Sequence, residues 1–336
     1  MKHLLTLADA PVPLILQWIN RANTFKTLLR TQNNPHLLPQ PAHRRTLAIM
    51  FNKRSTRTRV AAETAFSQLG GHPFFLSPSD IQLGVNESLR DTSTVLGSMT
   101  DMILLRCHLH EDAEMVAKFA GVPVVNALTD MYHPTQILAD IQTMHSAFGA
   151  SGTHSSEMTA GSLRGLKVAW IGDTNNVLHS MLVTLPRLGI HLHVATPNGY
   201  TLNPRVHARM HQVLSTHELA LVKWTHVPEE AVQDVDVVVT DTWVSMGMEQ
   251  EKQKRLRDFE GFQVTRALME RGGARPGWKL MHCLPRKQEE VSDDVFYDRE
   301  RSLVFEEAEC RKYTMMAVFE HFLQASTSSN GVASPK

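Results

Sequence analysis

Short apolar runs rich in β-branched residues, separated by stretches of helical composition, restrict the fold of this chain more than any other feature. In the first half they span 47–51, 73–76, 102–105 and 122–126, and in the second half 166–171, 190–195, 235–240, 279–283 and 303–305. Runs that are apolar on both faces and alternate with helices are typical of parallel sheets built from βαβ units. A chain of 336 residues is too long for one ordinary core. We therefore predict two α/β domains, each a central parallel β-sheet flanked by helices.

A domain boundary is expected near the small, polar stretch 148–156, which reads as a linker or a surface loop. Helical periodicity at 135–147 suggests that an interdomain helix carries the chain across. We predict domains at 1–147 and 148–311, with a C-terminal helix at 312–325 that rejoins the first domain. The Ser-rich segment 326–336 is expected to be a disordered tail.

The composition excludes several classes of protein. Lys plus Arg and Asp plus Glu both number 34, so no net charge attracts nucleic acid or a membrane surface. No run of about 18 apolar residues predicts a membrane span. Cys107, Cys283 and Cys310 lack Cys-x-x-Cys spacing, which argues against a disulfide framework or zinc knuckle and for a reducing compartment. The N-terminus resembles neither a signal peptide nor a transit sequence, and a removed presequence stays open.

The segment 55–59, Ser-Thr-Arg-Thr-Arg, lies between a predicted strand and a stretch of helical composition. A helix N-terminus favours anions through its dipole and its unpaired N–H groups, and arginine adds a planar fork that matches phosphate oxygens. The alternative is an ordinary N-cap with solvated arginines. With Lys53 and Arg54 upstream, four cations within seven residues would repel each other unless an anion lies among them. The pattern predicts a phosphate site.

Polar or charged side chains follow nearly every predicted strand. They include Arg106, His133 to Gln136, Asp173 to Asn176, Asp241 to Ser245, His282 to Arg286 and Glu306 to Arg311. Ligands of open parallel sheets bind beyond the carboxyl ends of the strands. Any one of these residues could be an ordinary loop residue, but together they favour a binding cleft between two sheets.

Two His-x-His pairs, 108/110 and 191/193, raise the possibility of a metal site. A strand would place both partners of a pair on one face, but no nearby carboxylate or cysteine completes a ligand set. We expect no metal and no cofactor. A dinucleotide site would need Gly-x-Gly-x-x-Gly after the strand at 166–171, where only Gly172 is present.

Five motifs together resemble the ornithine carbamoyltransferases, over essentially the whole chain. They are 51–59 (FNKRSTRTR), 83–89 (LGVNESL), 133–140 (HPTQILAD), 241–247 (DTWVSMG) and 282–287 (HCLPRK). The first and third are shared by carbamoyltransferases generally, and the last two are typical of the ornithine branch. The resemblance implies the reaction of carbamoyl phosphate with L-ornithine to give L-citrulline and phosphate, a step of arginine biosynthesis and the urea cycle.

The resemblance also implies a carbamoyl phosphate site. Its phosphate would be held by Ser55, Thr56, Arg57 and Thr58, with Arg57 as the main charge partner. Arg106 and His133 would face the developing oxyanion, and Gln136 would bind the amide end with the carbonyls of Cys283 and Leu284. Arg311 would close over the ligand, and Gln82 would reach in from a neighbouring subunit.

For ornithine, the resemblance implies that Asn176 binds the α-carboxylate and that Asp241 and Ser245 bind the α-ammonium, assisted by the backbone of Met246. The δ-amine has a pKa of ~10.4 and reacts only when neutral. Cys283 would accept its proton or orient it, with help from Asp241. Cys310 departs from the asparagine that the family usually has beside this arginine.

The rival interpretations are other acceptors and loss of activity. Aspartate carbamoyltransferases share the phosphate half but need cations for a second carboxylate, whereas Asp241 suits an ammonium. Acetylated ornithine, putrescine and other amines are harder to exclude. A non-catalytic relative that kept the fold would usually have lost charged site residues, whereas the matched positions here are filled. The family implies a homotrimer located in the mitochondrial matrix or the cytoplasm.

Overall fold

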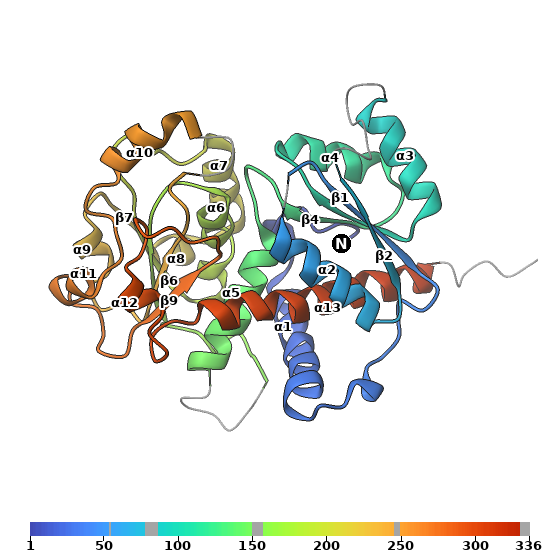
Figure 1. Ribbon diagram of the computed structural model, residues 1–336, viewed down its shortest axis with the longest axis horizontal. Coiled ribbons are helices and arrows are strands. Elements are labelled where there is room, and N and C mark those ends of the chain that lie inside the picture. Colours follow the sequence, from blue (N-terminus) through green and yellow to red (C-terminus); the bar gives the residue numbers. More distant parts are fainter. Residues whose placement is uncertain (54, 78–86, 150–156, 245–248, 330–336) are drawn as a thin grey trace, which may run out of the picture. The chain divides into compact units, whose positions relative to one another are not determined.

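The computed structural model describes residues 1–53, 55–77, 87–149, 157–244 and 249–329, which form two compact units (Figure 1). Unit 1 comprises Met1–Gln142 and Glu309–Lys336, and unit 2 comprises Thr143–Ala308. The chain passes between the units inside two continuous helices, α5 (Pro134–Phe148) and α13 (Val304–Ser329). The expected boundaries at 147/148 and 311/312 lie a few residues beyond these points, because a helix gives no compositional break.

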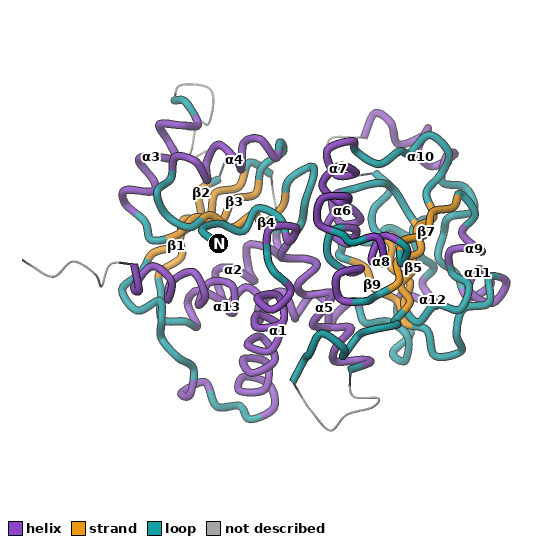
Figure 2. Tube along the Cα trace, turned by 180° about the vertical axis from the view of Figure 1, so that it is seen from behind, coloured by secondary structure: helices purple, strands orange, loops and turns teal. Residues whose placement is uncertain are grey.

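Each unit is built on one parallel sheet (Figure 2). The sheet of unit 1 has the order β2-β1-β3-β4, and that of unit 2 the order β7-β6-β5-β8-β9. The strands are β1 (Thr46–Phe51), β2 (His72–Leu76), β3 (Met102–Arg106), β4 (Val124–Leu128), β5 (Lys167–Ile171), β6 (His191–Ala195), β7 (Val222–Thr225), β8 (Val237–Thr240) and β9 (Lys279–His282). The α/β prediction with parallel sheets is confirmed.

In unit 1, α3 and α4 lie on one face of the sheet and α2 and α13 on the other (Figures 1 and 2). On the first face, Met50 and Leu105 pack with Ala113 and Val116 of α4. On the second face, the ring of Phe66 lies 5.6 Å from that of Phe319. The helices of unit 1, apart from the two shared ones, are α1 (Val12–Lys26), α2 (Thr56–Gln68), α3 (Leu89–Met99) and α4 (His110–Phe119), with short helical turns at Leu7–Asp9, Thr27–Thr31 and Pro35–Leu37.

In unit 2, a buried cluster joins the sheet to the helices that follow β7 and β8. Ile171 and Val238 of the sheet pack with Ala231 of α9, Met269 of α11 and Phe259, which directly follows α10. The helices of unit 2 are α6 (Asn176–Leu182), α7 (Pro204–Val213), α8 (Thr216–Leu219), α9 (Pro228–Ala231), α10 (Lys252–Asp258), α11 (Arg266–Arg271) and α12 (Asp293–Phe296), with short helical turns at Leu185–Leu188 and Glu249–Glu251.

Three local predictions differ from the structure. The run 303–305 is not a strand, because α13 begins at Val304 and Phe305 is exposed, and the contact with β9 is an isolated bridge between Ser302 and Leu280. Strand β7 was not predicted, because Lys223 and Trp224 are exposed at the sheet edge and break the apolar run. The helix expected to end at 325 continues to Ser329, and the rest of the predicted tail lies outside the described residues.

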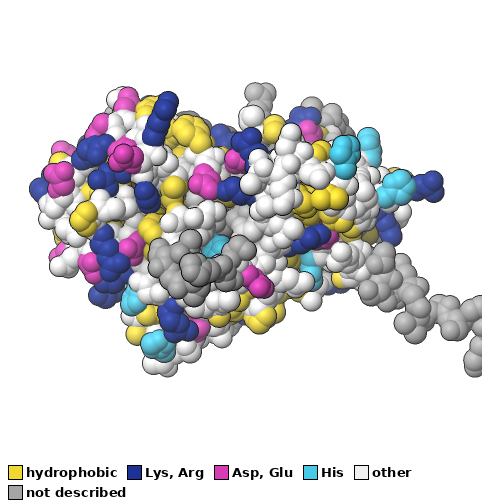
Figure 3. All heavy atoms as spheres, turned by 90° about the horizontal axis from the view of Figure 1, so that it is seen from below, with side chains coloured by type: hydrophobic (Ala, Val, Ile, Leu, Met, Phe, Trp, Pro, Cys, Tyr) yellow, Lys and Arg dark blue, Asp and Glu magenta, His cyan; other side chains and the backbone are white. Residues whose placement is uncertain are grey.

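The surface carries no segregated charge on the face shown in Figure 3, where basic and acidic side chains are interspersed. Among the described residues, no helix has the length and apolar character needed to cross a membrane. No group of three or more His, Cys, Asp or Glu side chains is arranged to hold a metal ion in the described part of the chain.

Candidate active site

The first half-site forms at the start of α2. Ser55 is the N-cap in extended conformation, and its Oγ accepts a hydrogen bond from the backbone N–H of Thr58 at 3.4 Å. Thr56 and Arg57 occupy the first turn of the helix, where backbone N–H groups have no partner within the helix. Thr56 is exposed, Arg57 is half-buried and Thr58 is buried. The strand-to-helix turn therefore presents hydroxyl, guanidinium and N–H groups at one helix end.

Arg311 of α13 reaches the same turn. Its Nη1 donates to Gln136 Oε1 at 2.6 Å, and its Nη2 lies 3.2 Å from Thr58 Oγ1 and 3.3 Å from Thr135 Oγ1. Gln136 Nε2 in turn donates to Asp140 Oδ1 at 2.8 Å. All five side chains are buried. The structure thus joins three predicted residues, Thr58, Gln136 and Arg311, in one network.

His133 and Arg106 lie beside this network at the carboxyl ends of the strands. Arg106 is the last residue of β3, and His133 immediately precedes α5. The Nδ1 of His133 lies 3.4 Å from Thr135 Oγ1. Burial, with the positive charges of Arg311 and Arg106, holds the pKa of His133 well below its usual range. The imidazole is therefore neutral, so it can donate one hydrogen bond without adding a charge.

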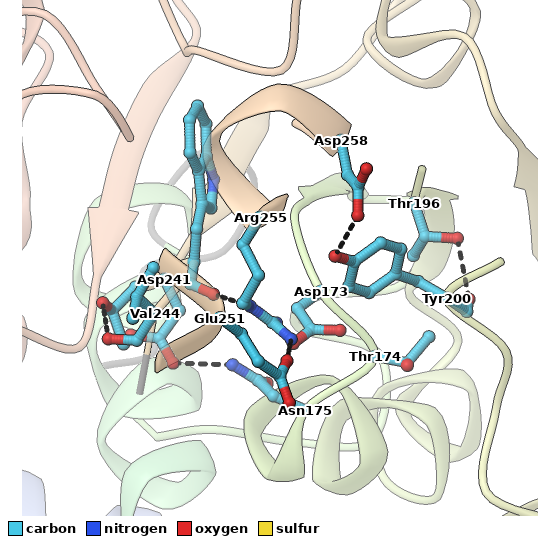
Figure 4. A network of polar contacts seen from close by, with 12 residues as sticks. Asp173, Thr174, Asn175, Thr196, Tyr200, Asp241, Val244, Glu251, Arg255 and Asp258 are labelled. Atoms are coloured by element: carbon cyan, nitrogen blue, oxygen red, sulfur yellow. Dashed lines mark hydrogen bonds and ion pairs between the residues drawn. The ribbon is translucent and has the colours of Figure 1, made fainter. Parts of the chain in front are cut away.

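The second half-site forms in unit 2 around Asp241, which directly follows β8. Its Oδ1 accepts a hydrogen bond from Cys283 Sγ at 2.9 Å. Its Oδ2 accepts one from Asn175 Nδ2 at 2.7 Å (Figure 4). Burial raises the pKa of Asp241 above its usual range, while the nearby His282 and the Cys283 hydrogen bond oppose that rise. The carboxylate is thus fixed by two donors at the carboxyl ends of β5, β8 and β9.

The loop after β9 is held by a buried pair. His282 Nε2 lies 3.1 Å from Glu290 Oε2, and both side chains are fully buried. His282 Nδ1 accepts a hydrogen bond from the backbone N–H of Leu284 at 2.9 Å. Leu284 has φ = 59°, a left-handed conformation that is unfavourable for leucine. The contacts of His282 therefore fix the unusual backbone beside Cys283.

Asn175 and Asn176 occupy different positions at the start of α6. Asn175 is the N-cap of α6, where its Oδ1 accepts from the N–H groups of Val177 and Leu178. Asn176 is the first residue of the helix, and its carbonyl accepts from Ser180 Oγ. The hydrogen bond to Asp241 thus comes from Asn175, while binding of a substrate carboxylate by Asn176 stays a prediction.

The predicted residues Gln82, Ser245 and Met246 lie outside the described residues. The structure adds Arg255 and Glu290, which the sequence analysis did not name, and gives partners to Thr135 and Asn175, which it named only as members of polar stretches. Thr135 and Asn175 stand beside predicted residues, and an Asn that precedes a helix is a recognisable capping signal. The contacts of Glu290 with His282 and of Arg255 with Trp243 carry no local signal, because these partners lie eight and twelve positions away in the sequence.

Comparisons with known proteins agree with this division of the chain. Residues 2–146 match the description "Aspartate/ornithine carbamoyltransferase, carbamoyl-P binding domain", and residues 164–322 match the corresponding "Asp/Orn binding domain". The mitochondrial ornithine carbamoyltransferase of Emericella nidulans is 46% identical over 335 residues, covering 96% of this chain and 89% of the relative. That of Aquarana catesbeiana is 49% identical over 279 residues, covering 83% of this chain and 75% of the relative.

Solved structures show the same relationship. A mitochondrial ornithine carbamoyltransferase from Coccidioides immitis superposes with a TM-score of 0.85 at 43% identity, covering 96% of this chain and 97% of the other. The ornithine carbamoyltransferase from Pyrococcus furiosus gives a TM-score of 0.85 at 36% identity, with the same coverage. With both domains matched and the two half-sites in place, the chain belongs to the ornithine carbamoyltransferase family.

Proposed function

We propose that this chain transfers the carbamoyl group of carbamoyl phosphate to the δ-amine of L-ornithine, giving L-citrulline and phosphate. The observation that carries the proposal is the buried Asp241, hydrogen-bonded by Cys283 and Asn175 in the unit that matches the Asp/Orn binding domain. A carboxylate suits an acceptor with an ammonium group. Aspartate as acceptor would need cations for its second carboxylate.

In unit 1, the start of α2 would hold the phosphate. Ser55, Thr56 and Thr58 offer hydroxyl and N–H donors, and Arg57 offers a bidentate guanidinium. The positive end of a helix dipole adds to this attraction. Phosphate leaves more readily when these donors neutralise its growing charge.

The carbamoyl oxygen would face Arg106 and His133. Thr135 Oγ1 lies 3.4 Å from His133 Nδ1 and accepts a hydrogen bond from Arg311 Nη2 at 3.3 Å, while its hydroxyl also donates to the carbonyl of Ala127 at 3.5 Å. A neutral imidazole that carries its proton on Nε2 would donate to the oxyanion as negative charge develops. Gln136, whose Oε1 accepts a hydrogen bond from Arg311 Nη1 at 2.6 Å, would bind the carbamoyl NH₂ group.

In unit 2, the amino acid would be bound by Asn176 at its carboxylate and by Asp241 at its ammonium, with Ser245 and Met246 completing the site. Cys283 would receive a proton from the δ-ammonium while its own proton passes to Asp241 Oδ1, 2.9 Å away. The raised pKa of Asp241 favours this acceptance. The neutral amine then attacks the carbamoyl carbon, a C–N bond forms, the C–O bond to phosphate breaks, and the departing phosphate takes the second amine proton.

The active assembly would be a homotrimer in which Gln82 reaches a neighbouring subunit's site. This proposal rests on the family, and analytical ultracentrifugation tests it: a stable active monomer would contradict it. The relatives from Emericella nidulans and Coccidioides immitis are named mitochondrial. We propose the mitochondrial matrix for this chain, with the cytoplasm as the alternative that imaging of a tagged full-length protein would reveal.

An acceptor panel tests the reaction itself. The protein would be incubated with carbamoyl phosphate and, separately, L-ornithine, L-aspartate, putrescine or N-acetylornithine, and the ureido product would be measured. We expect citrulline from ornithine at a rate at least about 100-fold above that of the other products, because each analogue loses or adds a charged group that the site must bind. Carbamoylation of another amine without citrulline would overturn the proposal.

A further inference from the structure

Arg255 of α10 is a buried arginine that none of the proposed substrate contacts uses. Only 6% of its surface is exposed. Its guanidinium forms an ion pair with Asp173 through Nη2 and donates to the backbone carbonyl of Trp243 through Nε (Figure 4). Its Nη1 lies 3.6 Å from Glu251, one turn earlier in the sequence.

The two main partners of Arg255 belong to the loops that carry the amino-acid half-site. Asp173 lies in the loop between β5 and α6, three residues before Asn176. Trp243 lies in the loop after β8, two residues after Asp241. The same loops are joined a second time by the Asn175–Asp241 hydrogen bond at 2.7 Å. Two cross-links thus fix the spacing between them, and Arg255 makes one of the two.

Aromatic side chains keep the Arg255 guanidinium in place. Its Cζ lies 5.1 Å from the centre of the Tyr200 ring, and the Tyr200 hydroxyl donates to Asp258 of α10 at 2.9 Å. The Trp243 ring stacks on Phe259 at 5.2 Å. The guanidinium is therefore restrained by its charge partner, by the flanking ring and by its own helix.

We infer that Arg255 is a positioning residue for the amino-acid substrate: by binding Asp173 and the Trp243 carbonyl at once, it sets the distance between Asn176 and Asp241. This inference rests on the proposed function, because the two loops are taken to bind the two ends of the α-amino acid group. A planar fork with several donors can serve a carboxylate and a carbonyl together. A lysine ammonium at this position cannot reproduce that geometry.

The test compares wild type with Arg255→Met and Arg255→Lys in steady-state kinetics. We expect the KM for ornithine to rise about 10-fold or more in Arg255→Met, and by a smaller factor in Arg255→Lys, because misplaced binding groups weaken substrate binding. The KM for carbamoyl phosphate should stay within about twofold, because that ligand binds in unit 1. L-Norvaline, which keeps the α-amino acid group but lacks the δ-amine, should lose inhibitory potency in parallel.

Arg275→Met is the matched control. Arg275 also pairs with two acidic residues of unit 2, Asp234 and Asp236. Asp236 directly precedes β8, so this cluster lies at the amino ends of the strands, opposite the loops of the half-site. We expect Arg275→Met to leave the KM for ornithine and the norvaline inhibition unchanged.

A double variant guards against misfolding. Arg255→Met could leave the Asp173 carboxylate without its positive partner, so that the protein does not fold. In that case Asp173→Asn combined with Arg255→Met removes both charges, and Arg255→Lys keeps the positive charge. Unchanged norvaline inhibition in the folded variants, or an equal rise in both KM values, would overturn the inference. An inactive wild type would instead refute the proposed function, which separates the two failures.

Discussion

At the residue scale, the two arginines in the first turn of α2 have different surroundings. Arg59 is exposed, pairs with Glu63 at 2.9 Å and lies 3.9 Å above the Phe75 ring. Arg57 is half-buried. We expect Arg57→Gln to weaken carbamoyl phosphate binding about 10- to 100-fold, because one charge-assisted bidentate contact is lost. Arg59→Gln should leave the KM for carbamoyl phosphate within about twofold. Equal effects of the two variants would contradict the phosphate assignment.

The thiols of Cys283 and Cys107 also have different surroundings. Burial and the neighbouring Asp112 raise the pKa of Cys107 to about 12, so it stays an inert thiol. Cys283 donates to Asp241 instead. We expect Cys283→Ser to lower kcat about 100-fold or more and to shift the pH–rate profile, because general acid–base steps contribute factors of this size. Carbamoyl phosphate binding should persist. Cys107→Ala is the control, and an unchanged pH–rate profile in Cys283→Ser would remove the proposed proton transfer.

His133 also predicts a pH dependence of stability. Its pKa is lowered in the folded protein, whereas the unfolded chain has an ordinary value of about 6.5. Below pH 6.5 the unfolded state therefore binds the proton first, so this group costs stability as the pH falls. Between pH 7.5 and 5.5 the free energy of unfolding should fall by about 1 kcal/mol less in His133→Gln than in wild type.

Urea unfolding at the two pH values measures that difference. The exposed His36, changed to Gln, is the control and should give the wild-type decrease. The other buried histidines remain in every variant and cancel in the comparison. An identical decrease in wild type and His133→Gln would contradict a buried neutral imidazole.

At the element scale, α3 depends on a close approach to the end of α4. A Cβ atom added at Gly97 would overlap the backbone carbonyl of Ala120. Backbone cannot yield as a side chain can, so we expect Gly97→Ala to lower the free energy of unfolding by about 2 kcal/mol, more than the helix propensity of alanine returns. Urea denaturation of Gly97→Ala and of Met99→Ala, at an exposed site on the same helix, tests this. A stabilised Gly97→Ala would show that the helices can separate.

The strands that were predicted correctly are those made of consecutive buried, apolar residues. The residues of β1 from Leu47 to Phe51 are all buried, so an apolar run marks the strand without any tertiary information. Edge strand β7 is half exposed. Lys223 and Trp224 interrupt its apolar run, so the same criterion does not detect this strand. The run 303–305 failed for the opposite reason, because three apolar residues suit the first turn of a helix equally well.

The residues of the candidate site also fall into two groups, those that a local sequence pattern marks and those that it does not. Asp241 and Cys283 directly follow buried strands, and ligands of parallel sheets bind beyond the carboxyl ends of strands, so the sequence predicted both residues. In the structure, Cys283 Sγ lies 2.9 Å from Asp241 Oδ1. Arg255 and Glu290 act through partners that only the folded chain brings near. No local pattern distinguishes such residues from ordinary surface charges.

At the scale of the whole molecule, the division of labour follows the division of the chain. Unit 1 holds the cationic network of Arg311, Thr58 and Gln136, and unit 2 holds the carboxylate of Asp241 with its two donors. Each half-site is assembled within one unit, the first from α2, α5 and α13 and the second from the loops that follow β5, β8 and β9. The chemistry requires both, because the phosphate leaving group and the amine nucleophile meet at one carbon.

Detecting the new carbon–nitrogen bond by NMR tests this account most directly. Carbamoyl phosphate labelled with ¹³C would be mixed with L-ornithine labelled with ¹⁵N at the δ position, and the product followed by ¹³C NMR. We predict a ureido carbon with one-bond coupling to ¹⁵N, formed in step with inorganic phosphate. A carbon signal without that coupling, from hydrolysis or from attack by the α-amine, would contradict carbamoyl transfer to the δ-amine.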